Sequence, residues 1–70
     1  MDILVFKTNL SDAQHIKAVE PTLDIHPLIY QWNVDLHDCD NILRVLSNSI
    51  AAEEVENLLM SAGYYCEELK

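Results

Sequence analysis

The chain has 70 residues, half of them hydrophobic, which is typical of one small folded domain spanning residues 1–70. Twelve acidic residues against four basic ones give a formal net charge of −8, and this excludes nucleic acid as a partner because phosphate binding needs a basic surface. The longest apolar run, Ile3 to Phe6, is far shorter than the roughly 20 residues of a membrane span, so no membrane contact is expected.

The cellular compartment is predicted from the start of the chain. Met1-Asp2 leads directly into the apolar run, without the basic start and long apolar stretch of a signal peptide. We therefore expect a cytoplasmic protein in which Cys39 and Cys66 are reduced thiols. The two cysteines have no CxxC spacing, so they indicate neither a zinc knuckle nor a thioredoxin-like redox motif.

The first third of the chain predicts a strand followed by a helix. The apolar run is rich in β-formers and bounded by polar residues, which favours a strand. Ser11 or Asp12 can cap a following helix, because a side-chain oxygen there accepts a hydrogen bond from a free N–H of the first turn. Apolar residues recur at helical spacing from Ala13 to Leu23, and Pro21 predicts a kink or an early end near Glu20.

The strongest local pattern is the strict alternation of apolar and polar residues from Tyr30 to His37, which predicts a half-buried strand. Its apolar side chains are expected to face the core, and these are Tyr30, Trp32, Val34 and Leu36, with Trp32 largely buried. A polar turn at 38–41 and a second β-rich run, Ile42 to Leu46, predict a hairpin. Arg44 must point to water, so Ile42 and Leu46 are expected on the outer face with it.

The last third of the chain predicts a second helix and a final strand. From Ser49 to Ala62 the apolar residues lie on one side and the glutamates on the other, which indicates an amphipathic helix. Gly63 is expected to end this helix, and Tyr64 to Cys66 to begin a short strand.

This order of elements predicts an α+β fold, the ferredoxin-like βαββαβ sandwich. Two right-handed crossovers that interleave in one antiparallel sheet give four strands, with the first strand central and both helices on one face.

With this order in view, the chain resembles the heavy-metal-associated domain of soft-metal chaperones and metal-transporting ATPases. Lys17-Ala18-Val19-Glu20 resembles the family's first helix, Trp32-Asn33-Val34-Asp35-Leu36 its second strand, and Ser61-Ala62-Gly63-Tyr64 the exit of its second helix. These stretches are mainly core and turn residues, so the resemblance implies the fold more than an activity.

The resemblance also implies where a metal loop would lie, and the chain departs from the family there. The family's loop reads glycine-met-thr-cys-x-x-cys, and it falls on residues 9–15 of this chain. Asp12 and His15 then stand in place of the two thiolates, Leu10 in place of the methionine, and Ser11 supplies the hydroxyl. Two thiolates suit Cu(I), whereas a carboxylate and an imidazole do not, so the resemblance implies a degenerate metal site.

A different metal site is the alternative to no metal at all. In the expected topology Asp12, His15, His37 and Cys39 come to one end of the sheet, with Cys66 a further candidate, and such donors could hold zinc at ~2.0–2.3 Å. In the simpler interpretation Asp12 caps a helix, His15 is a surface residue, His37 ends a strand and Cys39 sits in a turn. A Cys39–Cys66 disulfide is not expected, since the first strand separates the two residues.

No enzyme is predicted. Acidic neighbours disfavour both thiolates, because Cys66 adjoins Glu67 and Cys39 lies between Asp38 and Asp40. A single glycine leaves no phosphate-binding loop, and no cofactor is expected apart from a zinc-like ion.

The outward apolar residues give the leading hypothesis for function. If the expected alternation holds, the open sheet face carries Ile3, Val5, Ile42 and Leu46. A contiguous exposed apolar patch often marks an interface, although the side-chain stems of Lys7 and Arg44 could instead shield it. The sequence therefore favours a non-catalytic domain that binds a protein partner, or forms a homodimer, through this face.

Overall fold

A computed structural model describes residues 2–69, which form four strands and two helices. In chain order the elements are β1 (Asp2–Thr8), α1 (Ala13–Asp24), β2 (Ile29–Asp35), β3 (Ile42–Ser47), α2 (Ala52–Ser61) and β4 (Cys66–Glu68). Among the described residues, neither helix is long and apolar enough to cross a membrane.

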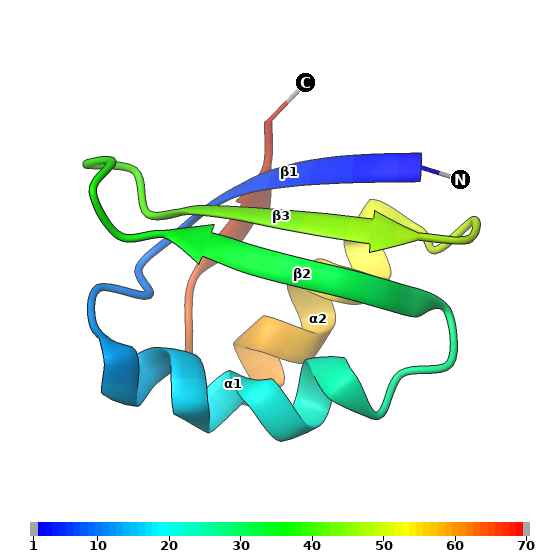
Figure 1. Ribbon diagram of the computed structural model, residues 1–70, viewed down its shortest axis with the longest axis horizontal. Coiled ribbons are helices and arrows are strands. Elements are labelled where there is room, and N and C mark those ends of the chain that lie inside the picture. The colour runs from blue at the N-terminus through cyan, green and yellow to red at the C-terminus, as the bar shows by residue number, and fades with distance from the viewer. Residues whose placement is uncertain (1, 70) are drawn as a thin grey trace.

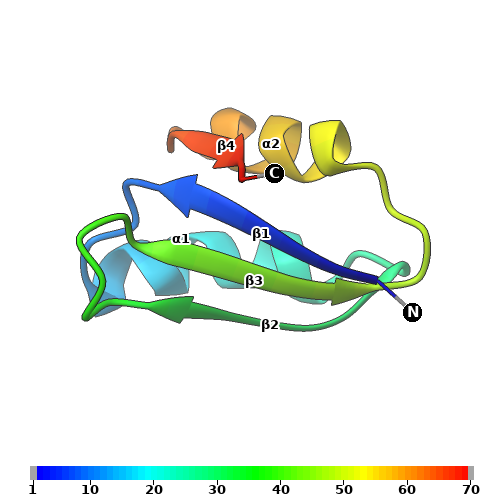
Figure 2. The ribbon, with the colours of Figure 1, turned by 90° about the horizontal axis from the view of Figure 1, so that it is seen from above.

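The strands form one antiparallel sheet in the order β2-β3-β1-β4, with β1 inside it as predicted. Both helices cover the same face of the sheet, and within residues 2–69 no helix covers the other face (Figure 1). Seen from above, the β1–α1 loop, the β2–β3 hairpin turn and the start of β4 lie at one end (Figure 2). The predicted ferredoxin-like fold is confirmed.

The core lies between the sheet and the two helices. Each helix contributes a fully buried pair spaced four residues apart, Val19 with Leu23 from α1 and Val55 with Leu59 from α2. Phe6 of β1 and the inward residues of β3 are also fully buried. Each such side chain stabilises the fold by about 1.5–3 kcal/mol relative to exposure, so these residues hold the helices against the sheet.

The first helix begins as predicted and ends later than predicted. Asp12 is the N-cap and accepts a hydrogen bond from the His15 N–H at 3.0 Å. The expected early end near Glu20 is wrong, because α1 continues through Pro21 to Asp24. Pro21 supplies no N–H to the preceding turn, and the fully buried Leu23 that follows it holds the last turn against the core.

The start of β2 differs from the predicted alternation. A β-bulge lies between Ile29 and Gln31, so Ile29 is buried whereas Tyr30 is 57% exposed. The prediction that Tyr30 and Leu36 face the core is therefore wrong: the bulge turns Tyr30 outward, and Leu36 lies beyond the end of the strand.

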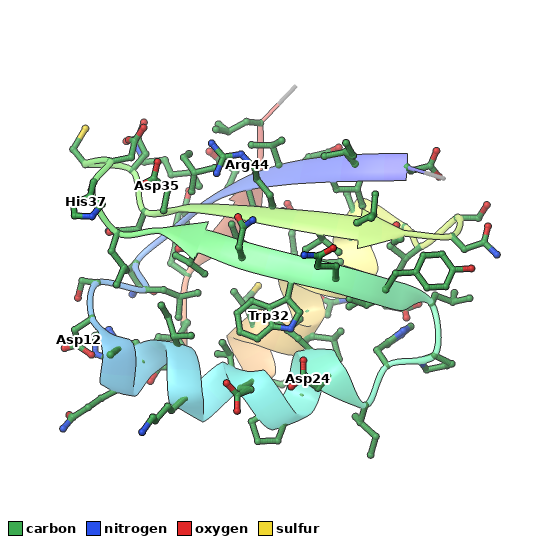
Figure 3. The ribbon with its side chains drawn as sticks, in the orientation of Figure 1. Asp12, Asp24, Trp32, Asp35, His37 and Arg44 are labelled. Carbon is green, nitrogen blue, oxygen red and sulfur yellow. The ribbon has the colours of Figure 1, made fainter. Side chains whose placement is uncertain are left out.

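The middle of β2 follows the prediction, because Trp32 and Val34 pack against the core. Trp32 is half-buried rather than largely buried. Its ring lies between β2 and α1, where the Nε1–H donates to Asp24 Oδ1 at 2.7 Å (Figure 3). An indole whose polar edge bonds to a surface carboxylate stays partly in water.

The second helix begins at Ala52 rather than at Ser49. Ser49 adopts a left-handed backbone conformation with φ 64°, and Ile50 turns inward and is buried, so these residues form an entry loop. In the described part of the chain, no side chain caps this helix at its N-cap residue, Ala51.

Gly63 ends α2, as predicted, with φ 94°. Its N–H donates to the Met60 carbonyl at 3.0 Å, and the Tyr64 N–H donates to the Leu59 carbonyl at 2.9 Å, which together form a Schellman motif. The last strand then begins at Cys66, slightly later than predicted.

One buried polar group is a local defect of the core. Ser47 is fully buried at the end of β3, and its Oγ has no hydrogen-bond partner among the described residues. We expect Ser47→Ala to raise the free energy of unfolding by about 1 kcal/mol, because it removes a buried hydroxyl without a partner. Chemical denaturation measures the change, and a loss of stability in the variant would contradict the assignment.

Candidate functional site

The β1–α1 loop is fastened to the β2–β3 hairpin turn through Thr8, which is buried at the end of β1. The Thr8 hydroxyl donates to the Asn41 carbonyl at 2.6 Å, and the Thr8 N–H donates to the Asp40 carbonyl at 3.1 Å. The same hydroxyl accepts from the Leu10 N–H at 3.2 Å, and Leu10 is fully buried. The loop therefore enters α1 from a fixed position.

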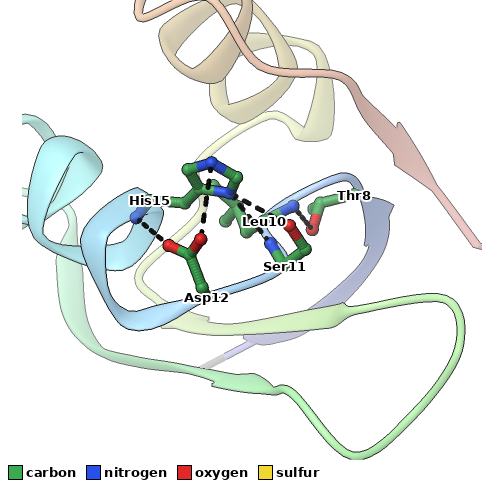
Figure 4. A network of polar contacts seen from close by, with 5 residues as sticks. All are labelled: Thr8, Leu10, Ser11, Asp12 and His15. Atoms are coloured by element: carbon green, nitrogen blue, oxygen red, sulfur yellow. Dashed lines mark hydrogen bonds and ion pairs between the residues drawn. The ribbon is translucent and has the colours of Figure 1, made fainter.

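The residues that follow form a polar network of their own (Figure 4). Besides capping α1, Asp12 places Oδ2 3.9 Å from His15 Nε2. His15 Nδ1 accepts from the Ser11 N–H at 3.1 Å and lies 3.3 Å from Ser11 Oγ. The His15 ring also contacts the Tyr64 ring, with centroids 5.2 Å apart. Asp12 and His15 are thus brought together, as the spacing predicts.

This network disfavours a metal ion in the loop. Because Nδ1 of His15 accepts a hydrogen bond, its ring proton belongs on Nε2. A metal bound at Nε2 would require that proton to move to Nδ1. Nδ1 would then be a donor facing the Ser11 N–H, which is also a donor, and their hydrogen bond would be lost. Asp12 and His15 also offer only two of the four ligands of a closed zinc site.

The other two predicted ligands lie on the hairpin. His37 and Cys39 are exposed, and the His37 N–H donates to Asp35 Oδ1 at 3.0 Å. Figure 3 shows His37 at the hairpin and Asp12 at the start of α1, on different layers of the same end of the molecule. Within residues 2–69, the structure does not gather three of the four predicted donors into one group.

A different group of donors does meet at the hairpin turn. Ligand atoms of Asp38, Cys39 and Asp40 lie within 4.8 Å of one another, and this is the one group of its kind among the described residues. Asp38 Oδ1 accepts from the Asp40 N–H at 2.9 Å, and Asp40 lies 3.7 Å from Lys7 Nζ. Asp38 and Asp40 were not among the predicted ligands, although their spacing around Cys39 is visible in the sequence.

Cys66 lies apart from this turn, since β1 separates β4 from β3. Both cysteines are free, Cys39 exposed and Cys66 buried. Burial raises the pKa of the Cys66 thiol to about 12, and the Glu56 carboxylate adds to the shift. The neighbouring charge is thus Glu56 on α2 rather than Glu67, the sequence neighbour.

The predicted apolar residues of the open face lie where the alternation placed them. Ile3 pairs with Leu46 across β1 and β3, and Val5 pairs with Arg44. Ile3 is 68% exposed, and Val5 and Leu46 are half-buried. Ile42 follows the same alternation but is only 7% exposed. It is therefore buried on this side of the sheet and, contrary to the prediction, does not belong to the exposed patch.

Among the contacts that sequence reasoning missed is one that joins distant elements. His26 Nε2 meets Glu54 Oε2, which links the α1–β2 loop to the first turn of α2. His26 Nδ1 accepts from the Leu28 N–H at 3.2 Å, so the ring proton faces the carboxylate. No local pattern reveals such a pair, because it depends on the packing of the two helices.

The two thiols should differ sharply in reactivity. We expect an aromatic disulfide reagent to label Cys39 rapidly in the folded protein and Cys66 only as the chain opens, because Cys39 is exposed whereas Cys66 is buried with a raised thiol pKa. The Cys39→Ser variant isolates Cys66, and rapid labelling of that variant under native conditions would contradict the assignment.

The same burial makes stability depend on pH. The Cys66 thiol keeps its proton in the folded chain up to about pH 12, whereas in the unfolded chain it ionises around its ordinary pKa of 9.0. The unfolded state therefore binds fewer protons above pH 9.0, and stability falls as the pH rises. Cys66→Ala should remove this part of the pH dependence, as urea unfolding at several pH values would show.

Comparison with known proteins gives structural likeness but no sequence match. No protein-family model matches the chain, and a search of curated proteins finds no match. A copper-binding domain from HMA7, a P-type ATPase, is 19% identical with a TM-score of 0.85, and the match covers 100% of this chain and 96% of that one. The yeast copper transporter domain Ccc2a is 14% identical with a TM-score of 0.83, covering 100% and 97%.

A structure of the Atx1-Cu(I)-Ccc2a complex matches with a TM-score of 0.81 and 14% identity, covering 97% of this chain and 94% of that one. At these identities the likeness concerns the backbone. The chain has the fold of copper-binding heavy-metal-associated domains, which confirms the predicted resemblance at the level of fold.

Proposed function

We propose that this chain is a non-catalytic protein-interaction domain in which Asp12 and His15 have replaced the thiolate pair of a soft-metal loop. It binds a protein partner through the open face of its sheet. The observation that carries this proposal is the apolar cross-strand pair of exposed Ile3 and half-buried Leu46, on a face that no helix covers within residues 2–69.

The first loop supports the loss of copper chemistry. Its two candidate donors are engaged with each other and with Ser11, and neither is a thiolate. Cu(I) prefers soft sulfur ligands. The two cysteines lie outside this loop, Cys39 in the hairpin turn and Cys66 buried in β4.

The charges of the open face indicate the chemistry of the partner. Lys7 and Arg44, two of the four basic residues, belong to this face by register. Lys7 lies near Asp40, whereas Arg44 is exposed and has no ion-pair partner among the described residues (Figure 3). A partner that places apolar side chains over Ile3 and Val5 and a carboxylate over Arg44 would complement this face.

A second copy of the chain is the less favoured occupant. Each copy carries a net charge of −8, so two copies repel each other before the apolar area is buried. The Ccc2a domain, which shares this fold, is found in a complex with another protein, Atx1. A domain of this architecture can therefore bind another protein.

Zinc binding at the hairpin turn is a second candidate, favoured by the meeting of Asp38, Cys39 and Asp40. Carboxylate and thiolate are both ligands of zinc, although Lys7 competes for Asp40. Zinc that binds there would protect Cys39 from the thiol reagent, and unchanged labelling in the presence of zinc would exclude this candidate.

Photo-crosslinking from single positions tests the proposed interface in the cell. We expect a photoreactive side chain at Ile3 to form an adduct with one defined protein, because that position lies in the contact. The same side chain at Met60 serves as a matched control, since Met60 is 62% exposed but lies on α2, on the opposite side of the sheet.

Val5→Asp should abolish the Ile3 adduct and leave the circular dichroism of the fold intact, because it puts a charge into the apolar contact. For the same purified partner, binding should weaken by about tenfold or more. Equal labelling from Ile3 and Met60, or no adduct from Ile3, would overturn the proposal. An adduct between two copies of the chain would show that the open face binds a second copy and not another protein.

A further inference from the structure

The sheet has one long edge without a partner strand. β2 is seven residues long and lies at the end of the strand order, so among the described strands it pairs only with β3. About half of its backbone N–H and C=O groups therefore point away from the sheet. Among residues 2–69, no side chain donates to or accepts from the backbone of residues 30–35.

The opposite edge is partly covered, because β4 pairs with β1 from Phe6 to Thr8. β4 has three residues, and the Glu68 N–H donates to Glu56 Oε2 of α2 at 2.8 Å. An edge is usually protected by proline, by charged side chains, above all lysine, by short length, by bulges or by a covering helix or loop. β2 contains no proline or lysine, and its bulge lies at the start, so the stretch from Trp32 to Asp35 is a regular free edge.

A groove runs beside this edge. It has a volume of about 490 Å³ and lies between α1 and β2, with Ile16, Trp32 and Val34 contributing apolar surface. Its charged lining is purely acidic, Glu20 and Asp24 from α1. Figure 3 shows Trp32 and Asp24 pointing toward each other in this region, and their hydrogen bond holds the indole between strand and helix.

We infer that the β2 edge and its groove bind an extended basic segment of another protein, which adds to the sheet as a fifth strand. The segment's backbone would pair with β2, and alternate side chains would enter the groove. A lysine or arginine there meets the Glu20 carboxylate and the Trp32 ring, which attract cations by charge and by cation–π contact.

The acidic charge of the groove favours a basic segment of another protein over the β2 edge of a second copy of this chain. Edge-to-edge pairing of two copies would bring the acidic groove residues Glu20 and Asp24 of both chains to one interface, and each chain already carries a net charge of −8. A basic strand from another protein has no such penalty. The groove is separate from the open face. It would bind a basic partner, whereas the open face with Arg44 would bind an acidic one.

Synthetic peptides as long as β2 test this inference directly. The probe alternates valine with lysine, and its matched control alternates valine with glutamate. Trp32 is the one tryptophan of the chain and lines the groove, so its fluorescence reports binding without a label. We expect the lysine peptide to shift this fluorescence in a saturable manner and the glutamate peptide to leave it unchanged.

Backbone pairing is distinguished from simple charge attraction by N-methylation. Two further lysine peptides carry methyl groups on alternate amides, in the two opposite phases. In a paired strand, only every second amide N–H points toward β2. The peptide methylated on those amides should therefore lose binding by about tenfold or more, while the other peptide keeps it. Equal effects of both phases would overturn strand addition.

Charge reversal in the protein locates the site. Glu20→Lys should weaken binding of the lysine peptide by about fivefold, whereas Glu53→Lys makes the same change of net charge on α2 and should have little effect. The reverse order would place the peptide at the acidic surface of α2 and β4 and overturn the inference. Val5→Asp should leave peptide binding unchanged, so the outcome is independent of the open-face proposal.

Discussion

Thr8 fixes the end of the molecule where a metal loop would lie. Its side chain is buried at the end of a central strand, where its hydroxyl donates to the hairpin turn and accepts from the N–H of Leu10. These bonds and the burial of Leu10 set where the chain enters α1. The positions of Asp12 and His15 are therefore determined by the sheet and the hairpin turn, which together form the frame of the loop. The polar network around His15 therefore depends on this anchor.

Much of the fold could be predicted from the sequence because the relevant signals are local. Alternation in β1 and β3 placed Ile3, Val5, Leu46 and Arg44 on the open face, and the register agrees. The N-cap at Asp12 and the left-handed Gly63 follow from side-chain and backbone chemistry that acts within one turn.

The errors arose where tertiary packing overrides a local rule. The bulge that turns Tyr30 outward is set by pairing with β3, and α1 passes Pro21 because Leu23 is buried beyond it. The donors meet differently from the prediction for a similar reason. The topology brings Asp12 and His37 to one end of the sheet, but they lie in different layers there. In the described part of the chain, the one group of three donors is formed by the sequence neighbours Asp38 to Asp40.

The Cu(I) affinity of the reduced protein tests most directly the claim that the frame persists while the loop chemistry has changed. In competition with a strong Cu(I) chelator, we predict that the wild-type chain leaves the metal with the chelator. The Asp12→Cys, His15→Cys double variant should retain Cu(I), because the same frame would then present two thiolates on the first turn of α1. A wild-type chain that holds one equivalent of Cu(I), and loses it when Cys39 and Cys66 are replaced by serine, would contradict the account.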